Sequence, residues 1–313
     1  MADIGHVSIC IVGFRNPQDI VACLGALAKS AYRDFSVVIC ENGGAEAYAG
    51  LVRAVPAALP GGQAVTAFDA GANLGYAGGV NACIAASREA AAWWVLNPDT
   101  LPHPDALRHL ADRLAVGDCG LVGATIHGPD GLVESRGGRW IAPLARAESI
   151  DRGKRLDDPT SQAGIEADLS FVSGASMLVG PRFAERVGLM REDYFLYGEE
   201  VEWCLRGLAR GERLGLAVEA RVLHNQGSTT GSVADLRRRS RMAVFLDERN
   251  KLLTTRDCAP SLLPVVAVGS FLMLWLRFAR RAAWRQLGYA MQGWWAGLLG
   301  RRGVPDFVAP QKA

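Results

Sequence analysis

The sequence lacks the cysteine spacing of a zinc or disulfide protein. Its seven cysteines are an odd number, and none belongs to a C-x-x-C pair. A zinc site or a disulfide framework needs closer spacing, so we expect reduced thiols in a reducing cytoplasm. The chain also has no basic and apolar signal segment at its start, because the apolar run from Val7 to Val12 stops at Gly13. We therefore expect a cytoplasmic protein that is not exported.

Several nucleotide and nucleic-acid signatures are missing as well. There is no G-x-G-x-x-G fingerprint and no Walker lysine, which argues against nicotinamide-binding and P-loop proteins. No DNA-reading or RNA-reading motif accompanies the basic residues. Residues 1–225 carry 20 Lys and Arg against 27 Asp and Glu, whereas residues 226–313 carry 14 against 5. An acidic body with a basic tail predicts contact with an anionic phospholipid surface and no nucleic-acid partner.

The sequence does contain short apolar runs that alternate with segments of helical spacing. Val7 to Val12 and Phe35 to Cys40 are too short for helices, and Pro17 to Ser30 between them has helical apolar spacing. We predict further strands at 64–68 and 93–96, separated by a loop at 69–79 and a helix at 80–91. The alternation predicts an α/β fold with an open, mostly parallel sheet flanked by helices.

Polar residues follow each of these predicted strands. Ligands of such sheets bind beyond the carboxyl ends of the strands, so these residues are candidates for a nucleotide site. They are Arg15 after the first strand, Glu41 and Asn42 after the second, Asp69 and Asn73 after the third, and Asn97 and Asp99 after the fourth.

The tetrapeptide Leu96-Asn97-Pro98-Asp99 holds a carboxylate on a stiff turn. A divalent cation that is bound by few carboxylates and by substrate phosphates needs such a fixed ligand, so Asp99 is a candidate metal ligand. The simpler alternative is an Asn-Pro turn in which Asp99 caps the next segment. The tetrapeptide alone favours that alternative.

The glycine-rich segment from Asn73 to Asn81 enters a predicted helix. Its glycines would let the backbone approach a nucleotide and aim amide groups at phosphate. A turn chosen only for tight packing explains the segment equally well. Further along, residues 129–167 show no clear period, and we predict a long surface excursion there.

Acidic residues and a histidine complete the candidate set. Glu199 and Glu200 start a predicted helix after an aromatic run, which suits a partly desolvated general base, although acids at a helix start are also ordinary capping residues. Arg206 lies two turns further along the same face, where it would pair with these acids. His224 ends a short apolar stretch and is a candidate second metal ligand, although a structural histidine is the commoner case.

Taken in order, these segments resemble the inverting glycosyltransferases of family 2, which have the GT-A fold, and especially their rhamnosyltransferase-like and galactofuranosyltransferase-like branches. The resemblance covers about two thirds of the chain. It implies a GT-A catalytic domain at 1–230, with a nucleotide-binding half at about 1–100 and an acceptor half at about 101–230. A helical C-terminal region at 231–313 would follow.

The resemblance also implies a role for individual residues. Glu200 would be the catalytic base with Glu199 beside it, and Asp99 and His224 would hold Mn²⁺ or Mg²⁺, with Asn97 at most a weak or water-mediated ligand. The implied donor-binding residues are Val12, Gly13, Arg15, Glu41, Asn42, Asp69, Asn73, Gly75, Gly78, Asn81 and Asn97. The implied acceptor-side residues are Ser173, Gly174, Ala175, Trp203 and Arg206.

The implied reaction is a single inverting displacement. A hydroxyl of a cell-surface or lipid-linked saccharide would attack the anomeric carbon of a nucleoside-diphosphate sugar, either dTDP-rhamnose or a UDP-sugar. One rival is a sugar nucleotidyltransferase, which needs a basic glycine-rich loop after the first strand, where this chain offers only Arg15. Another is a non-catalytic nucleotide-sugar-binding scaffold, which would be favoured if Asp99, Glu200 and His224 failed to converge.

The stretch from Cys258 to Leu276 contains no charge and is followed by several arginines. Its length is borderline for a membrane span, and Pro260, Pro264 and Gly269 interrupt it. We therefore predict a helix that lies in the interface of the inner membrane in preference to one that crosses it. A helix buried against the catalytic domain is the remaining alternative. The expected location is peripheral, on the cytoplasmic face of the membrane.

Overall fold

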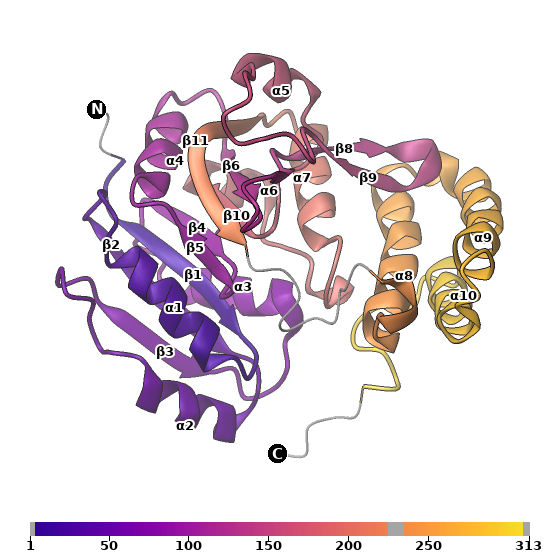
Figure 1. Ribbon diagram of the computed structural model, residues 1–313, viewed down its shortest axis with the longest axis horizontal. Coiled ribbons are helices and arrows are strands. Elements are labelled where there is room, and N and C mark those ends of the chain that lie inside the picture. Colours follow the sequence, from indigo (N-terminus) through magenta and orange to yellow (C-terminus); the bar gives the residue numbers. More distant parts are fainter. Residues whose placement is uncertain (1–3, 225–234, 309–313) are drawn as a thin grey trace.

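The computed structural model describes residues 4–224 and 235–308. A nine-stranded sheet lies at its centre, in the order β3-β2-β1-β4-β10-β6-β11-β5, with β7 paired to β6 (Figure 1). The strands are β1 (Val7–Gly13), β2 (Phe35–Glu41), β3 (Val65–Asp69), β4 (Ala92–Leu96), β5 (Thr100–Pro102), β6 (Leu121–His127), β7 (Val133–Ser135), β10 (Ser176–Val179) and β11 (Leu214–His224), and β8 (Gly138–Ile141) and β9 (Arg146–Ser149) form a separate hairpin.

The first four strands are parallel, and the sheet becomes mixed beyond them. β10 runs antiparallel to both β4 and β6, and β11 is parallel to β6 and antiparallel to β5. The predicted α/β class and mostly parallel sheet are therefore confirmed. Pairing aligns Gly13, Glu41 and Asp69 across β1, β2 and β3, so these strands end level with one another.

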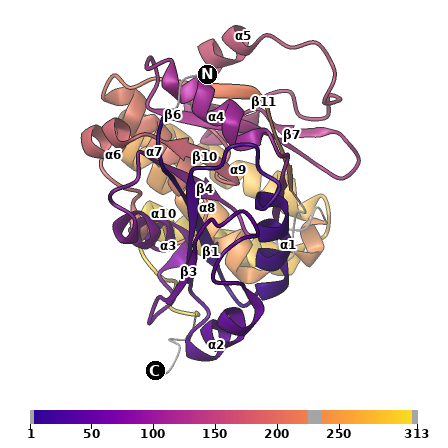
Figure 2. The same cartoon turned by 90° about the vertical axis from the view of Figure 1, so that its left-hand side faces the viewer.

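Helices cover both faces of the sheet. Figure 2 shows α1 and α3 on opposite sides of β1. Ile9 of β1 packs in the same core as Leu24 of α1, whereas Cys10 packs with Val80 of α3. The helices are α1 (Pro17–Leu27), α2 (Ala45–Ala54), α3 (Gly75–Ala86), α4 (Ala106–Ala115), α5 (Gln162–Asp168), α6 (Pro181–Val187), α7 (Glu199–Ala209), α8 (Arg241–Cys258), α9 (Leu263–Ala279) and α10 (Trp284–Leu298).

Two predicted segments differ from the structure. The glycine-rich segment is not a loop up to Gly79, because α3 already begins at Gly75 and ends at Ala86. The glycines there sit in tight helix packing, which a sequence pattern does not distinguish from a turn. Residues 129–167 are not a plain surface excursion either, since they contain β7, the β8–β9 hairpin and α5, and Arg136 among them is only 1% exposed.

The C-terminal helices form a group beside the β8–β9 hairpin (Figure 1). α8 packs along α10, and Ala145 of the hairpin is fully buried against Leu252 of α8 and Val266 of α9. The hairpin therefore joins the sheet domain to the C-terminal helices. The predicted domain boundary at 230/231 lies outside the described residues.

Candidate active site

A cavity of about 480 Å³, which we call the strand-end cavity, opens at the carboxyl ends of the parallel strands. It brings together residues from both halves of the sequence, as expected for a ligand site on an open α/β sheet. Twelve of the predicted site residues line it: Val12, Asn42, Asn73, Gly75, Asn97, Asp99, Ser173, Gly174, Ala175, Glu199, Glu200 and His224. The predicted candidates for metal, base and nucleotide binding thus converge on one cavity.

Glu41 is fully buried at the end of β2. Its Oε1 accepts hydrogen bonds from the backbone N–H groups of Arg15, at 3.0 Å, and Gly43, at 2.7 Å. Its Oε2 has no hydrogen-bond partner among the described residues, and a Cβ at Gly13 would lie 2.6 Å from it. A buried oxygen without a partner is costly, so Glu41 can accept a bond from a ligand N–H or hydroxyl. Gly13 and Glu41 end β1 and β2, and Arg15 follows β1, but none of the three lines the strand-end cavity.

Asn42 holds the start of α3 in place. Its Nδ2 donates to the Gly75 carbonyl at 2.8 Å, and the backbone N–H of Gly75 donates to Asn73 Oδ1 at 3.0 Å. Gly75 has a φ of +72°, and a Cβ on it would lie 2.1 Å from the carbonyl oxygen of Phe195. Only glycine meets both requirements. The Tyr76 N–H donates to the same Phe195 carbonyl at 2.8 Å, which ties α3 to the loop before α7.

Asp99 and His224 form a pair on the cavity wall. His224 Nε2 lies 3.4 Å from Asp99 Oδ1, and its Nδ1 lies 3.3 Å from Glu134 Oε2. Burial lowers the pKa of His224, but the bonds to these two carboxylates outweigh burial and raise the pKa to about 9. A cation bound to the imidazole would displace its proton.

The residues at this pair fit a divalent cation that takes its other ligands from a substrate. Within 4–224 and 235–308, no group of three or more His, Cys, Asp or Glu residues is arranged to hold a metal. One carboxylate and one imidazole are therefore what the described protein offers, and phosphate oxygens and water would complete the coordination shell.

Glu199 and Glu200 lie at the first turn of α7, where the chain enters the helix from Gly198. Burial raises the pKa of both carboxyls, and the charge of Glu200 raises the pKa of Glu199 further. Glu200 Oε2 accepts the Gly198 N–H at 3.1 Å. A Cβ on Gly174 would touch the Glu200 side chain at 3.5 Å, so the Ser173-Gly174-Ala175 segment leaves room beside it. A partly desolvated carboxylate with a raised pKa suits a general base.

Five other predicted site residues do not line the cavity and instead make contacts that stabilise the fold. Asn81 Nδ2 donates to the Met190 carbonyl at 2.9 Å, which fastens α3 to the segment before α7. Trp203 is fully buried, and its Nε1 donates to the Gly188 carbonyl. Arg206 pairs with Glu202 at 2.8 Å, not with Glu199 or Glu200, because Glu202 is one helical turn away from it whereas Glu199 is two turns away. Asp69 accepts the Gly71 N–H, and Gly78 packs against Leu74.

Arg249 and Asn250 of α8 were not among the predicted site residues, yet both donate hydrogen bonds to the loop before the acidic pair. Asn250 Nδ2 donates to the carbonyls of Tyr194, Leu196 and Tyr197 at 3.1, 2.9 and 2.6 Å. Arg249 is 1% exposed and donates to the Tyr194 carbonyl at 2.7 Å. The available signal was a run of five polar residues, 247–251, within one helix, since buried polar groups need partners.

The loop that these two side chains hold is conformationally unusual. Phe195 and Tyr197 have φ values of +68° and +70°, in the left-handed region that costs energy for residues other than glycine. The hydrogen bonds from Asn250 and Arg249 offset that cost. The C-terminal helix α8 therefore shapes the approach to Glu199 and Glu200.

Comparisons with known proteins agree with this geometry. The N-acetylglucosaminyl-diphospho-decaprenol L-rhamnosyltransferase of Mycobacterium tuberculosis is 29% identical over 240 residues, covering 66% of this chain and 72% of that protein. The low-salt glycan biosynthesis hexosyltransferase Agl10 of Haloferax volcanii is 26% identical over 197 residues, and the match spans 60% of this chain but only 59% of that relative.

Solved structures show the same fold. The mannosyltransferase PcManGT of Pyrobaculum calidifontis, solved with GDP-Man and Mn²⁺, has a TM-score of 0.57 at 16% identity, with 94% of this chain and 87% of that chain covered. TarS of S. aureus (residues 1–349) has a TM-score of 0.53 at 10% identity, with 92% and 80% covered. A sequence model described as glycosyltransferase like family 2 matches residues 5–243, which is most of the chain. The chain therefore belongs to glycosyltransferase family 2.

Proposed function

We propose that this chain transfers a sugar from a nucleoside-diphosphate sugar to a hydroxyl group of a saccharide acceptor, with inversion at the anomeric carbon. The observation that carries the proposal is that Asp99, His224 and Glu200 line one cavity at the strand ends. A site for a cation and a general base with a raised pKa are the two groups that such a displacement uses. Their convergence argues against a scaffold without catalytic activity.

Each residue then has a chemical task. Glu200 takes the proton of the acceptor hydroxyl as its oxygen bonds to the anomeric carbon, and the bonding pair of the broken carbon–oxygen bond leaves with the diphosphate. Asp99 and His224 would hold Mn²⁺ or Mg²⁺, which neutralises charge on the leaving diphosphate. Glu41 positions the backbone of Arg15 and Gly43 at the end of β2, next to the proposed nucleoside site, and Asn42 keeps Gly75 in position.

The donor follows from the relatives only as a proposal. A rhamnosyltransferase and a hexosyltransferase are among the similar proteins, which supports dTDP-rhamnose or a UDP-hexose as donor. The mycobacterial relative's name includes a diphospho-decaprenol acceptor, which supports a lipid-linked saccharide acceptor here.

A screen of nucleotide sugars tests the proposal. Uridine, thymidine and guanosine diphosphate sugars are added with Mn²⁺, and binding to the folded protein raises its melting temperature. The sugar that raises it most is then followed for release of nucleoside diphosphate and for the anomeric configuration of the product. We expect inversion. If a nucleotide sugar binds but no sugar is transferred, the scaffold alternative is correct, and if pyrophosphate is released from a nucleoside triphosphate, the protein is a nucleotidyltransferase. If no nucleotide sugar binds, the proposal is wrong.

We also propose that the C-terminal helices bind an anionic membrane surface from the cytoplasmic side. Among the described residues, one helix, Pro260–Ala279, is long and apolar enough to cross a membrane, and 22% of its most apolar window is buried. One side of α9 packs through Val266 and Leu274, while Val268 is 64% exposed and Leu272 58%. A helix with one packed side and one exposed apolar side suits the bilayer interface better than a crossing.

Basic residues border this exposed apolar side. Arg280, Arg281 and Arg285 follow α9 and are exposed, and they would meet phosphate headgroups. The Leu272→Glu/Met273→Glu double variant should no longer float with vesicles that contain phosphatidylglycerol. Val116→Glu changes an apolar residue that is 67% exposed on another element and should float like the wild type. The proposal would be contradicted if the wild-type protein did not bind these vesicles, or if the exposed apolar side of α9 were buried in a dimer.

A further inference from the structure

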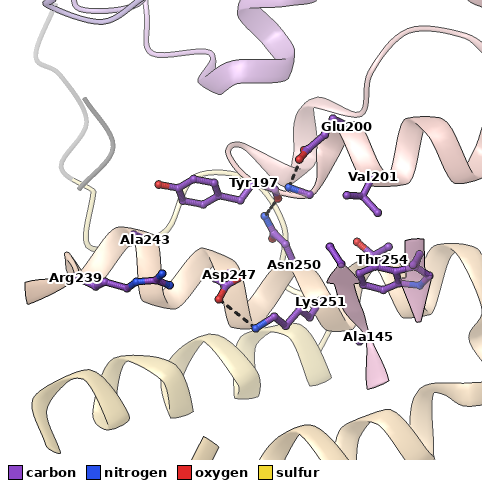
Figure 3. A pocket seen from close by; sticks show the side chains of 13 residues that line it. Ala145, Tyr197, Glu200, Val201, Arg239, Ala243, Asp247, Asn250, Lys251 and Thr254 are labelled. Carbon is purple, nitrogen blue, oxygen red and sulfur yellow. Dashed lines mark hydrogen bonds and ion pairs between the residues drawn. The ribbon is translucent and has the colours of Figure 1, made fainter. Parts of the chain in front are cut away.

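A second cavity, of about 250 Å³, lies between the β8–β9 hairpin, the loop before α7 and helix α8; we call it the hairpin cavity. Glu200, Tyr197 and Arg239 line both cavities, so the two spaces meet at the proposed base. Figure 3 shows Tyr197 and Glu200 on one side of the hairpin cavity and Asp247 and Lys251 of α8 on the other. None of the strand-end residues lines it.

The size and position of this cavity restrict what it can hold. Its volume is below the roughly 300–1,000 Å³ of pockets for drug-sized ligands, so it suits a single ring. An acceptor must bring a hydroxyl to Glu200 while the donor occupies the strand-end cavity. Glu200 lines the hairpin cavity, and none of the strand-end residues does, so an acceptor there would not overlap with the donor.

The charges in the hairpin cavity are balanced. Its lining contains two acids, Glu200 and Asp247, and two cations, Arg239 and Lys251. Lys251 Nζ lies 3.1 Å from a carboxylate oxygen of both Asp247 and Glu248, so its charge is already neutralised. An anionic ligand would meet Asp247 and Glu200 without gaining a spare cation. A neutral ligand with several hydroxyl groups fits this balance, because such groups both donate and accept hydrogen bonds.

The apolar part of the lining includes an indole ring beside small aliphatic side chains. Trp140 of β8 lines the cavity, and its Nε1 is buried without a hydrogen-bond partner among the described residues. A buried indole N–H usually has an acceptor, so this donor is available to a ligand oxygen. An indole face with a free N–H beside hydroxyl-binding side chains is a suitable surface for a sugar ring.

We propose that the hairpin cavity binds the acceptor sugar as a neutral pyranose ring, with Trp140 against the ring and Asp247 and Lys251 on its hydroxyl groups. This rests on the proposed glycosyl transfer. One ring hydroxyl faces Glu200; its oxygen bonds to the donor's anomeric carbon, its proton goes to Glu200, and the electron pair of the broken bond leaves with the diphosphate. Acceptor selection thus belongs to the β8–β9 hairpin and α8.

The test places a large side chain in the hairpin cavity by substitution at an exposed residue. Ala147 of β9 is exposed and lines the hairpin cavity, so Ala147→Trp should block it without disturbing a core. Arg146→Trp adds the same ring next to it on the same strand, at an exposed residue that does not line the cavity. Methyl glycosides of glucose, galactose, mannose and N-acetylglucosamine serve as neutral acceptors, and methyl glucuronide and glucose 6-phosphate as anionic ones.

Release of nucleoside diphosphate above the rate of donor hydrolysis reports transfer. We expect at least one neutral glycoside, and neither anionic sugar, to support transfer by the wild type. Ala147→Trp should raise the KM for that glycoside about tenfold or more, as loss of a central contact does, while Arg146→Trp and the melting shift with nucleoside diphosphate and Mn²⁺ stay unchanged. Transfer only to anionic sugars, no transfer to any neutral glycoside, or an unchanged KM in Ala147→Trp would overturn the proposal. A wild type whose melting temperature no nucleotide sugar shifts contradicts the proposed function instead.

Discussion

The active site has two walls whose side chains are positioned in different ways. The strand-end wall consists of Asn42, Asn97, Asp99 and His224. The C-terminal wall consists of Asp247, Asn250 and Lys251. The strand-end residues follow strands whose register fixes where they end. The C-terminal residues lie on one helix, α8, and Asn250 among them donates hydrogen bonds to a loop with positive φ values. The first wall is set by local sequence, and the second by packing between distant segments.

This difference predicts different consequences of mutation. Changes in the strand-end wall should affect the donor and the cation, and changes in the C-terminal wall should affect the acceptor and the loop before Glu199. The following variants test that separation, from the largest expected effect to the smallest.

Asp99→Asn should lower turnover about 10²- to 10³-fold, because it removes the charged ligand that the structure offers to a cation. The melting shift that Mn²⁺ and nucleoside diphosphate produce together should also shrink. Asn97→Ala is the matched control on the same turn and should have a smaller effect on both. Equal effects of the two variants would show that Asp99 is not a special ligand.

Gly75→Ala should destabilise the protein by about 3 kcal/mol or more, since it combines a positive φ with a clash. Its Cβ would lie 2.1 Å from the Phe195 carbonyl. Gly71→Ala has the same φ of +72° but open space around its Cβ, and should cost only about 1–2 kcal/mol. Urea unfolding of both variants isolates the contact between α3 and the loop before α7. Equal losses would mean that this contact contributes nothing.

Asn250→Ala should destabilise the protein by about 1–3 kcal/mol, because buried carbonyls lose their donor. It should also lower kcat about tenfold, since the loop that positions Glu200 loosens. Thr255→Ala removes another buried polar side chain of α8, whose hydroxyl donates to the Lys251 carbonyl of the same helix, and should affect stability without affecting kcat. If kcat stays at the wild-type value in Asn250→Ala at a temperature where the protein is folded, α8 does not position the loop.

Glu199→Gln should stabilise the protein by about 1 kcal/mol at neutral pH, because burial opposes a charge there. The pKa of Glu199 is raised in the folded state, so its protonated form contributes stability at low pH, and that contribution is lost as pH rises through the folded pKa. The variant should flatten this dependence. Glu202→Gln, which breaks a buried pair with Arg206, should destabilise instead. Thermal unfolding across pH measures both.

Much of the strand-end wall could be predicted from the sequence because its residues directly follow apolar runs. Parallel pairing then brings Asn42, Asn97 and Asp99 together without further information. The family and the fold class are confirmed, and Asp99, Glu200 and His224 line one cavity, although their roles stay predictions. The domain limits, the donor and the membrane contact stay predictions.

The remaining features depend on contacts between segments far apart in the chain. Asn81 and Trp203 lie near motif residues in the sequence. In the structure their side chains donate hydrogen bonds to the carbonyls of Met190 and Gly188, so both residues stabilise the fold and do not line the cavity. Trp140 and Asn250 belong to no recognisable motif. They line the same cavity as Glu200 because the β8–β9 hairpin and α8 pack together. Burial and pairing of this kind are set by tertiary packing, which a local pattern does not report.

Glu200 lines both cavities, together with Tyr197 and Arg239, and the Glu200→Gln variant tests its role most directly. With the donor identified by the screen and with Mn²⁺ present, we expect turnover about 10²- to 10⁴-fold below wild type and an unchanged melting shift with the donor. In the wild type, turnover should fall as pH drops through a pKa above the usual glutamate value. Turnover at the wild-type rate in Glu200→Gln would contradict the account.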